Sequence, residues 1–254
     1  MMPGLATVRQ IEAVGFRAWP ATSVHYDGTW AIRMTAAHPS KRLNSINPLD
    51  PADIRDIPAR VERASQRFRA YGRRPVFRQS PLAPPELDDY LASRGWERLD
   101  ETVVMTADLT AMDFAGTIDQ IPLRDIGRYV DASLKVHGRD ASLRAGFSEL
   151  LNGIRPVKGM FMIEEDGQPV SVALCVHDGA MAGLFDIGTS RESRRNGHGR
   201  AIVASALKWA MKHGAKTAWL QIETVNAPGL ALYEGFGFTE IYRYAYRESP
   251  NHEG

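Results

Sequence analysis

The stretch GLFDIGTSRESRRNGHGRAIVASALKWAMKHG, residues Gly183–Gly214, decides the fold. A strand ends at Thr189, a loop rich in arginine and glycine follows, and a helix opens at once. That helix is predicted over Arg200–His213, where Val203, Ala206 and Ala210 recur at helical spacing and Gly214 stops it. The loop carries, in order, Arg194, Arg195, Asn196, Gly197, His198 and Gly199.

This loop suits a phosphate or a diphosphate. Its glycines let the backbone approach a ligand, and the first N–H groups of the helix, together with the helix dipole, attract an anion. No Gly-Lys-Ser/Thr closes the loop, so it is not a nucleotide-triphosphate loop, and GHGRAI lacks the third glycine of a dinucleotide fingerprint. On the loop alone, a solvated Gly-Arg turn remains the alternative.

A second motif narrows the choice between an anion-binding loop and a solvated turn. The loop resembles the acyl-CoA-binding signature of the GCN5-related N-acetyltransferase (GNAT) family, Arg/Gln-x-x-Gly-x-Gly/Ala, at Arg194, Gly197 and Gly199. The same family expects a strand, an asparagine and a Leu-Tyr-x-x-x-Gly-Phe helix end farther on. The stretch LQIETVNAPGLALYEGFGF, residues 220–238, supplies Asn226 and Tyr233 in that order. The resemblance covers roughly residues 116–247.

The resemblance implies a mixed α/β sheet flanked by helices and an acetyl-CoA-dependent N-acetyltransferase. A primary amine of a small molecule or peptide would attack the thioester directly, with both substrates bound. The strand residues Ile187 and Thr189 would hold the acetyl and pantetheine groups. The remaining donor-binding residues would be Arg194, Arg195, Asn196, Gly197, His198, Gly199, Arg200 and Asn226. Tyr233 occupies the general-acid position, where a phenol with an ordinary pKa of about 10 is protonated at neutral pH.

The general base stays open. Many relatives carry glutamate where this chain has Gln221, which cannot take a proton. Glu223 lies two residues on and therefore on the same face of that strand. Asp186 matches an acidic position of the family, but strict alternation points it away from Phe185 and Ile187. Either carboxylate could serve, or the amine could lose its proton to solvent before it binds.

The first half of the chain repeats the second. A helical face from Ile57 ends at Gly72, and setting Gly72 against Gly214 gives an offset of 142. At that offset, without a gap, the following pairs coincide: Val61 with Val203, Ala64 with Ala206, Gln79 with Gln221, Gly95 with Gly237, and Trp96 with Phe238. We therefore predict two GNAT-like halves, residues 1–112 and 113–254, that meet near Leu109–Gly116.

The first half lacks the residues that would bind the cofactor and supply the general acid. The glycine loop falls on ADIRDI, residues 52–57, and Tyr233 falls on Leu91. We therefore predict a degenerate half that binds no cofactor and walls the active site. Arg42–Ser45 aligns with the strand that carries Asp186, which suggests either a second polar surface or a satisfied turn before Pro48.

The second half is expected to begin with antiparallel strands. Its predicted helices are residues 123–137 and 142–154, and its predicted strands are residues 160–164, 169–177, 181–189 and 218–224.

Composition sets the outer limits. The 254 residues, with 44% hydrophobic and 24% charged side chains, allow one large domain or two modest ones at roughly 150 residues per domain. A net charge of +1 gives no field for nucleic acid or a membrane surface. The single Cys175 excludes an internal disulfide, and the seven histidines show no metal-ligand spacing. The N-terminus has no leader pattern.

We accordingly expect a cytoplasmic monomer or homodimer without a metal. The rival interpretation is a non-catalytic acyl-CoA sensor or interaction module, which would keep the glycine loop but transfer no acetyl group. Retention of Tyr233 favours the enzyme, and Gln221 favours the sensor.

Overall fold

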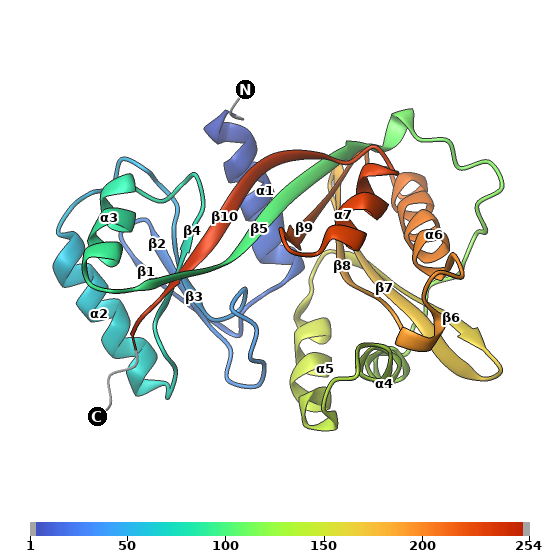
Figure 1. Cartoon of the computed structure of the whole chain (residues 1–254), viewed down its shortest axis with the longest axis horizontal. Helices are drawn as coiled ribbons and strands as arrows, with labels where there is room; N and C mark the ends of the chain where they lie inside the picture. The colour runs from blue at the N-terminus through green and yellow to red at the C-terminus, as the bar shows by residue number, and fades with distance from the viewer. Residues whose placement is uncertain (1–3, 251–254) are drawn as a thin grey trace.

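Two similar series of helices and strands follow one another in the computed structural model, which describes residues 4–250 (Figure 1). The first series is α1 (Leu5–Ala18), β1 (Ser23–Asp27), β2 (Trp30–Met34), β3 (Ser45–Pro48), α2 (Ile57–Ala70), β4 (Val76–Gln79), α3 (Pro85–Ser93) and β5 (Glu97–Asp108). The second is α4 (Ile126–His137), α5 (Arg144–Gly153), β6 (Val157–Glu165), β7 (Gln168–Asp178), β8 (Met181–Thr189), α6 (His198–Lys212), β9 (Thr217–Glu223), α7 (Ala227–Glu234) and β10 (Thr239–Glu248).

The offset of 142 residues holds for whole elements. Shifted by that number, α2 would span residues 199–212, and α6 spans His198–Lys212. Shifted likewise, β4 falls inside β9, α3 falls on α7, and β5 begins with β10 at residue 239. The repetition seen in the sequence is therefore a repetition of secondary structure, while the boundary at residue 112 stays a prediction.

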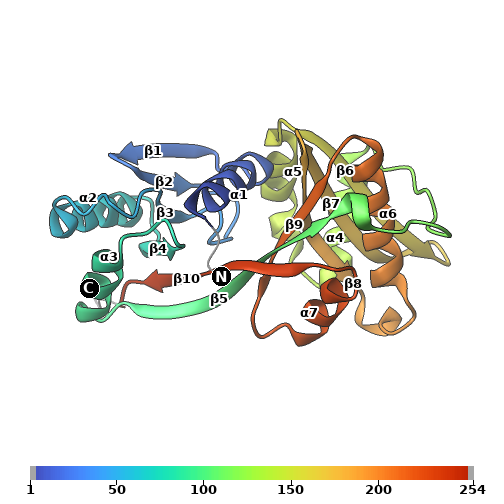
Figure 2. The same ribbon diagram turned by 90° about the horizontal axis from the view of Figure 1, so that it is seen from above.

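The strands form one sheet in the order β1-β2-β3-β4-β10-β5-β9-β8-β7-β6. The pairs β3/β4 and β8/β9 are parallel, and the other neighbours are antiparallel. Each series lends its last strand to the other: β10 pairs with β4, and β5 pairs with β9. In Figures 1 and 2, β5 and β10 run side by side from one half into the other. Backbone hydrogen bonds thus join the halves.

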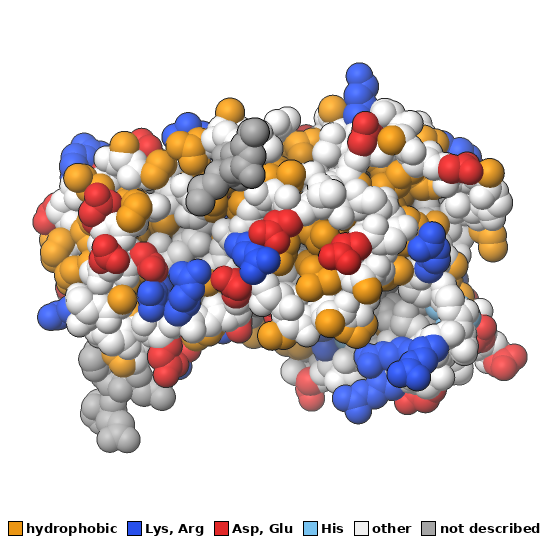
Figure 3. All heavy atoms as spheres, turned by 45° about the horizontal axis from the view of Figure 1, so that its top comes forward, with side chains coloured by type: hydrophobic (Ala, Val, Ile, Leu, Met, Phe, Trp, Pro, Cys, Tyr) orange, Lys and Arg blue, Asp and Glu red, His pale blue; other side chains and the backbone are white. Residues whose placement is uncertain are grey.

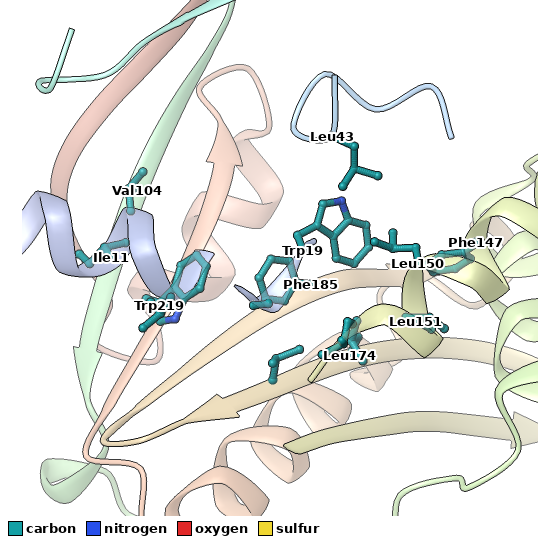
Figure 4. Packing of buried hydrophobic residues seen from close by; sticks show 14 of the residues in the cluster. Ile11, Trp19, Leu43, Val104, Phe147, Leu150, Leu151, Leu174, Phe185 and Trp219 are labelled. Carbon is teal, nitrogen blue, oxygen red and sulfur yellow. The ribbon is translucent and has the colours of Figure 1, made fainter. Parts of the chain in front are cut away.

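The two faces of the second half carry separate hydrophobic clusters, because alternate residues of each strand point to opposite faces. One cluster lies under α6 and includes Cys175, whose burial raises the pKa of its thiol. The other packs α1, α4 and α5 on the opposite face and continues into the first half (Figure 4). There Trp19, at the end of α1, stacks on Phe185 with ring centroids 5.3 Å apart. The first half has its own cluster beneath α2 and α3.

The first half also touches the second through a loop after β2. A Cβ added to Gly146 on α5 would lie 1.8 Å from the carbonyl oxygen of Ala37, so helix and loop are in direct backbone contact. His38 on the same loop lies edge-on to Phe147 of α5, with ring centroids 6.1 Å apart. The first half therefore contacts the second beside α5, while its role as a wall of the active site stays a prediction.

Helix boundaries shift slightly from the sequence expectation. The helix predicted to start at Leu123 starts at Ile126, because Leu123 bridges to Met160 and the Asp125 carboxylate caps the backbone N–H of Arg128. The helix predicted over residues 142–154 is a 3₁₀ turn, Ala141–Leu143, followed by α5.

In the part of the chain that the structure describes, none of the helices has both the length and the apolar character needed to cross a bilayer. Within the same residues, no three His, Cys, Asp or Glu side chains converge as metal ligands.

Candidate active site

A groove of about 1220 Å³ runs between the end of β8, the start of α6 and the helix α7. The end of α4 closes its other side. Most of the donor-binding residues expected from the sequence line it, namely Ile187, Thr189, Arg194, Arg195, Gly197, His198, Gly199, Arg200 and Asn226. Tyr233 lines it as well. Asn196, Asp186 and Glu223 do not belong to its lining.

The start of α6 is built to receive an anion. Gly197 caps the helix with φ +82°, a left-handed conformation that glycine adopts without strain. A Cβ on Gly199 would lie 3.4 Å from Thr189 Oγ1, so a larger residue would take space between helix and strand. The first N–H groups of a helix have no partner within the helix, and with the dipole they form an anion site.

Basic side chains surround this helix end. Arg194 donates from Nε to the carbonyl oxygen of Thr189 at 3.4 Å, and the Arg200 guanidinium stacks over Phe236. Basic side chains also gather at the lower edge of the right-hand half in Figure 3. The His198 ring turns instead toward Glu165, with Nε2 3.3 Å from Oε1, so only its backbone is placed to serve the groove.

The helix α7 positions Asn226 and Tyr233. The Asn226 side chain caps α7 by accepting a hydrogen bond from the backbone N–H of Gly229 at 3.1 Å. Tyr233 lies seven residues later, near the end of the same helix. It is 8% exposed, and its ring lies edge-on to Phe238. Burial raises the pKa of Tyr233 above its usual value, because the phenolate would lose solvation. The hydroxyl is therefore held in its protonated form beside the groove.

The structure corrects the expected direction of the Asp186 side chain. The sequence pattern points it away from Phe185, but the two side chains lie on the same face of the sheet. Two residues of β8, Asp186 and Ile187, oppose one of β7, Ala173, and Asp186 has φ +48°, so a β-bulge breaks the alternation. Phe185 joins the cluster around Trp19, and the Asp186 carboxylate turns to α4.

The Asp186 carboxylate is fully engaged. Its oxygens accept from Ser133 Oγ at 2.5 Å, Arg139 Nη1 at 2.8 Å and the Tyr129 hydroxyl at 3.1 Å. His137 Nε2 lies 3.2 Å away. Burial raises the pKa of Asp186, but the hydrogen bond and charge of His137 and the charge of Arg139 outweigh it and hold the pKa below its usual range. Asp186 thus holds α4 residues in place as an ionised anchor.

The sequence places His137 in a segment, His137–Arg139, expected near the acceptor pocket, but assigns it no catalytic role. This histidine ends α4, lines the groove and is 19% exposed. A Cβ on Gly188 would lie 2.5 Å from its ring, so the imidazole rests against the backbone of β8. When Nε2 donates to Asp186, Nδ1 is left to accept a proton. The only signal in the sequence was its place just before Gly138, which ends the helix.

Glu223 and Gln221 lie on the opposite side of β9 from the cluster under α6. Glu223 is exposed at the end of the strand, opposite Thr102 of β5. Gln221 is partly buried and accepts a hydrogen bond from the Tyr244 hydroxyl at 2.9 Å. Neither side chain reaches the groove in this arrangement.

The matching loop of the first half is filled by its own ion pairs. Asp56, with φ +48°, caps α2 where Gly197 caps α6. Asp53 is 4% exposed and lies 3.1 Å from Arg60 Nη1. The Arg60 guanidinium also covers the Trp30 ring. Leu91, opposite Tyr233 in the repeat, is fully buried. The groups of this loop that could bind a ligand therefore contact one another instead.

The comparisons with known proteins agree with this geometry. A family model described as probable histone acetyltransferase Rv0428c C-terminal matches residues 5–247. The uncharacterized N-acetyltransferase YobR of Bacillus subtilis (strain 168) is 27% identical over 247 residues, 94% of this chain and 98% of that protein.

Solved structures share the fold across the whole chain. A GCN5-related N-acetyltransferase from Kribbella flavida matches with a TM-score of 0.70 and 19% identity, covering 99% of this chain and 98% of that one. A tandem GNAT protein from the clavulanic acid biosynthesis pathway matches with a TM-score of 0.62 and 15% identity, covering 96% and 89%. The expected mixed α/β fold with two GNAT halves is thereby confirmed.

Proposed function

The chain belongs to the family described as probable histone acetyltransferase Rv0428c C-terminal and is a GNAT-type N-acetyltransferase, and from this premise we propose where and how it acts. Acetyl-CoA binds in the groove between β8, α6 and α7. The acceptor is a primary amine of a small molecule or a peptide, and it attacks directly while both substrates are bound. The observation that carries this proposal is the single groove that gathers the glycine loop, Asn226 and Tyr233.

Donor binding is divided among three elements. The free N–H groups at the start of α6 and the side chains of Arg194 and Arg195 face the diphosphate. The backbone of Ile187 and Thr189 at the end of β8 holds the pantetheine arm, since β8 and β9 are paired only as far as Gly183 and Trp219. Beyond that point the strands leave a gap. Acetyl-CoA supplies a thioester carbonyl that a neutral amine can attack.

His137 serves as the general base in this proposal, replacing Glu223 and Asp186 in that role. Its ring lines the groove, and Asp186 fixes the orientation of that ring. An ionised carboxylate behind a histidine also stabilises the imidazolium that forms when Nδ1 accepts the proton of the amine. Asp186 is thus a positioning residue, and its buried, multiply bonded carboxylate suits that task.

Tyr233 serves as the general acid. Its hydroxyl is protonated across the working pH range because burial raises its pKa. It lies on the α7 side of the groove, opposite the His137 side, so acid and base approach the reacting centre from different elements. Retention of Tyr233 favours the enzyme over a non-catalytic sensor, because a phenol at the groove can donate a proton during transfer.

A titration of acetyl-CoA into the intact chain tests the placement of the donor. One site per chain is expected, and Gly199→Glu should weaken binding at least tenfold. The new carboxylate would face the diphosphate, and like charges brought together cost several kcal/mol, where about 1.4 kcal/mol is a factor of ten. Ala52→Glu places the same charge on the exposed matching loop of the first half and should leave binding unchanged. A second site, or loss of binding in Ala52→Glu, would refute a silent first half.

A further inference from the structure

The first half of the sheet turns a polar face toward α1. Arg33 on β2, Ser45 and Asn47 on β3, and Arg78 on β4 are all buried there. Their strand neighbours on the opposite face, Trp30, Ile32, Ile46 and Phe77, pack in the cluster beneath α2. A sheet face under a helix is ordinarily apolar, so this buried polar face calls for a physical reason.

The charges on this face do not balance. Glu12 of α1 pairs with Arg78 and accepts the Tyr242 hydroxyl at 2.5 Å. Arg33 donates to two backbone carbonyl oxygens, those of Trp19 at 2.5 Å and Arg42 at 2.8 Å. The partly buried Arg42 donates to the carbonyl oxygen of Gln221 at 3.3 Å.

Among residues 4–250, no carboxylate lies within ion-pairing distance of Arg33 or Arg42. Three guanidinium groups therefore share one carboxylate, that of Glu12. Buried charges are normally paired, because their desolvation is expensive. An excess of buried guanidinium groups over carboxylates favours the binding of an anionic group.

A small cavity lies among these side chains. Its space is about 20 Å³, which holds a water-sized group. Arg33, Arg42 and Arg78 line it from the first half, and Phe185 and Gln221 line it from the second. In the described residues, Arg78 Nε has no hydrogen-bond partner although its side chain is 5% exposed. The cavity thus offers unused donors as well as excess positive charge.

The cavity adjoins the point where acetyl transfer would occur. Phe185 and Gln221 stand on the diverging parts of β8 and β9, and both face α1. Ile187, which lines the acetyl-CoA groove, is two residues beyond Phe185, or roughly 7 Å along the strand. The groove and the cavity therefore lie near each other along β8, and the end of α4, which lines the groove, packs on the same face of the sheet as α1.

We propose that this cavity receives one carboxylate oxygen of the acceptor, while the rest of the acceptor lies outside it, so that the substrate is a small amine that also carries a carboxylate, as an amino acid does. The inference rests on the proposed function, because it presumes that an amine enters from the α1 side of the gap. The positive potential of these guanidinium groups also acts on Tyr244. Burial raises its pKa, yet the charges of Arg42 and Arg78 outweigh burial and lower it. Arg42, in a segment that the sequence suggested as a second polar surface, contributes its charge to the site.

Thermal unfolding tests the site without relying on acetyl transfer. Sodium propionate should raise the Tm of the intact protein in a saturable manner, because a ligand of the folded state stabilises it. Propionamide, and sodium chloride at the same ionic strength, should not. An equal rise with chloride would assign the cluster to inorganic anions and overturn the proposal, and so would the absence of any propionate effect.

Arg42→Met separates a binding role from a structural one. Arg42 donates to the carbonyl oxygen of Gln221 and interacts with the Tyr244 hydroxyl, and none of the described carboxylates pairs with it, so its removal leaves no buried carboxylate unpaired. We expect the propionate shift to be lost while the Tm without ligand stays equal or rises, since one of three clustered cations is gone. A structural role predicts a lower Tm instead. Arg42→Lys should retain part of the shift, and Arg67→Met, an exposed α2 residue, should retain all of it.

Acceptor kinetics complete the test. Amino acids such as β-alanine and glycine are compared with their own carboxamides. At least a tenfold higher kcat/KM is expected for the carboxylate form, and Arg42→Met should abolish that preference. If amide and acid are acetylated equally, the inference is wrong and the proposed function stands. If neither is acetylated although propionate shifts the Tm, the anion site stands and the proposed function is in error.

Discussion

Replacing Tyr233 by phenylalanine is expected to lower kcat about 10²- to 10⁴-fold, the range that a positioned general acid contributes. The ring would still pack against Phe238, so the KM for acetyl-CoA should change little. In the unchanged protein, the raised pKa of Tyr233 keeps the acid protonated as pH rises. Turnover should therefore not decline on the alkaline side until the pH passes the ordinary value for a phenol, about 10.

The control for this variant is Tyr71→Phe, which removes the hydroxyl of an exposed tyrosine at the end of α2. Steady-state kinetics of both variants across neutral and alkaline pH provide the measurement. A Tyr233→Phe enzyme that keeps wild-type kcat would remove this residue from the mechanism and leave only a packing role for it.

Replacing His137 by glutamine is expected to lower kcat by a similar factor of about 10² to 10⁴, because the amine loses its proton acceptor. Glutamine can still donate a hydrogen bond to Asp186, so the end of α4 should keep its position. The activity that remains should rise more steeply with pH than in the wild type, since only amine already neutral in solution can react. Added imidazole should restore part of the rate.

His25→Gln, on the exposed strand β1, is the matched control and should behave as wild type. Full activity in His137→Gln, with an unchanged pH profile, would return the base to Glu223 or to solvent. Asp186→Asn distinguishes positioning from catalysis. If Asp186 acts through His137, its replacement adds little to the defect of His137→Gln in the double variant.

That the glycine loop, Asn226 and Tyr233 lie together could be predicted because the determinants of their positions are local. Gly197, Gly199 and the arginines before them lie within a few residues of one another, and a strand–loop–helix sequence fixes their relative placement. Asn226 and Tyr233 similarly belong to one short helix whose start and end are marked by an asparagine cap and a glycine turn. Such patterns can be recognised without knowing how the strands pair in the sheet.

The contacts of Asp186 and the buried polar face under α1 could not be predicted, because their residues meet only through pairing between distant strands and helices. The bulge that turns Asp186 toward α4 exists only where β8 meets β7, and it carries no mark in the sequence. His137 reaches Asp186 across 49 positions. Arg33 and Arg78 alternate with apolar residues and would be taken as solvent-facing, yet α1 covers them.

The exchange of β5 and β10 is also invisible in the sequence. β5 and β10 are similar in length and begin at equivalent positions of the two repeats. Either strand could therefore pair beside β4 or beside β9. The observed exchange goes with the packing of α1 against β7 and β8 and of the loop around Ala37 and His38 against α5, so the first half lies on the side where we propose that the acceptor enters.

Acetyl transfer by the intact protein is measured most directly as release of free thiol from acetyl-CoA in the presence of primary amines. We expect release that depends on both substrates, with an acetylated amine formed in equal amount, and we expect Gly199→Glu to abolish it while Ala52→Glu does not. Undiminished release in Gly199→Glu, or release with no acetylated amine, would contradict a transfer reaction centred on the groove of the second half.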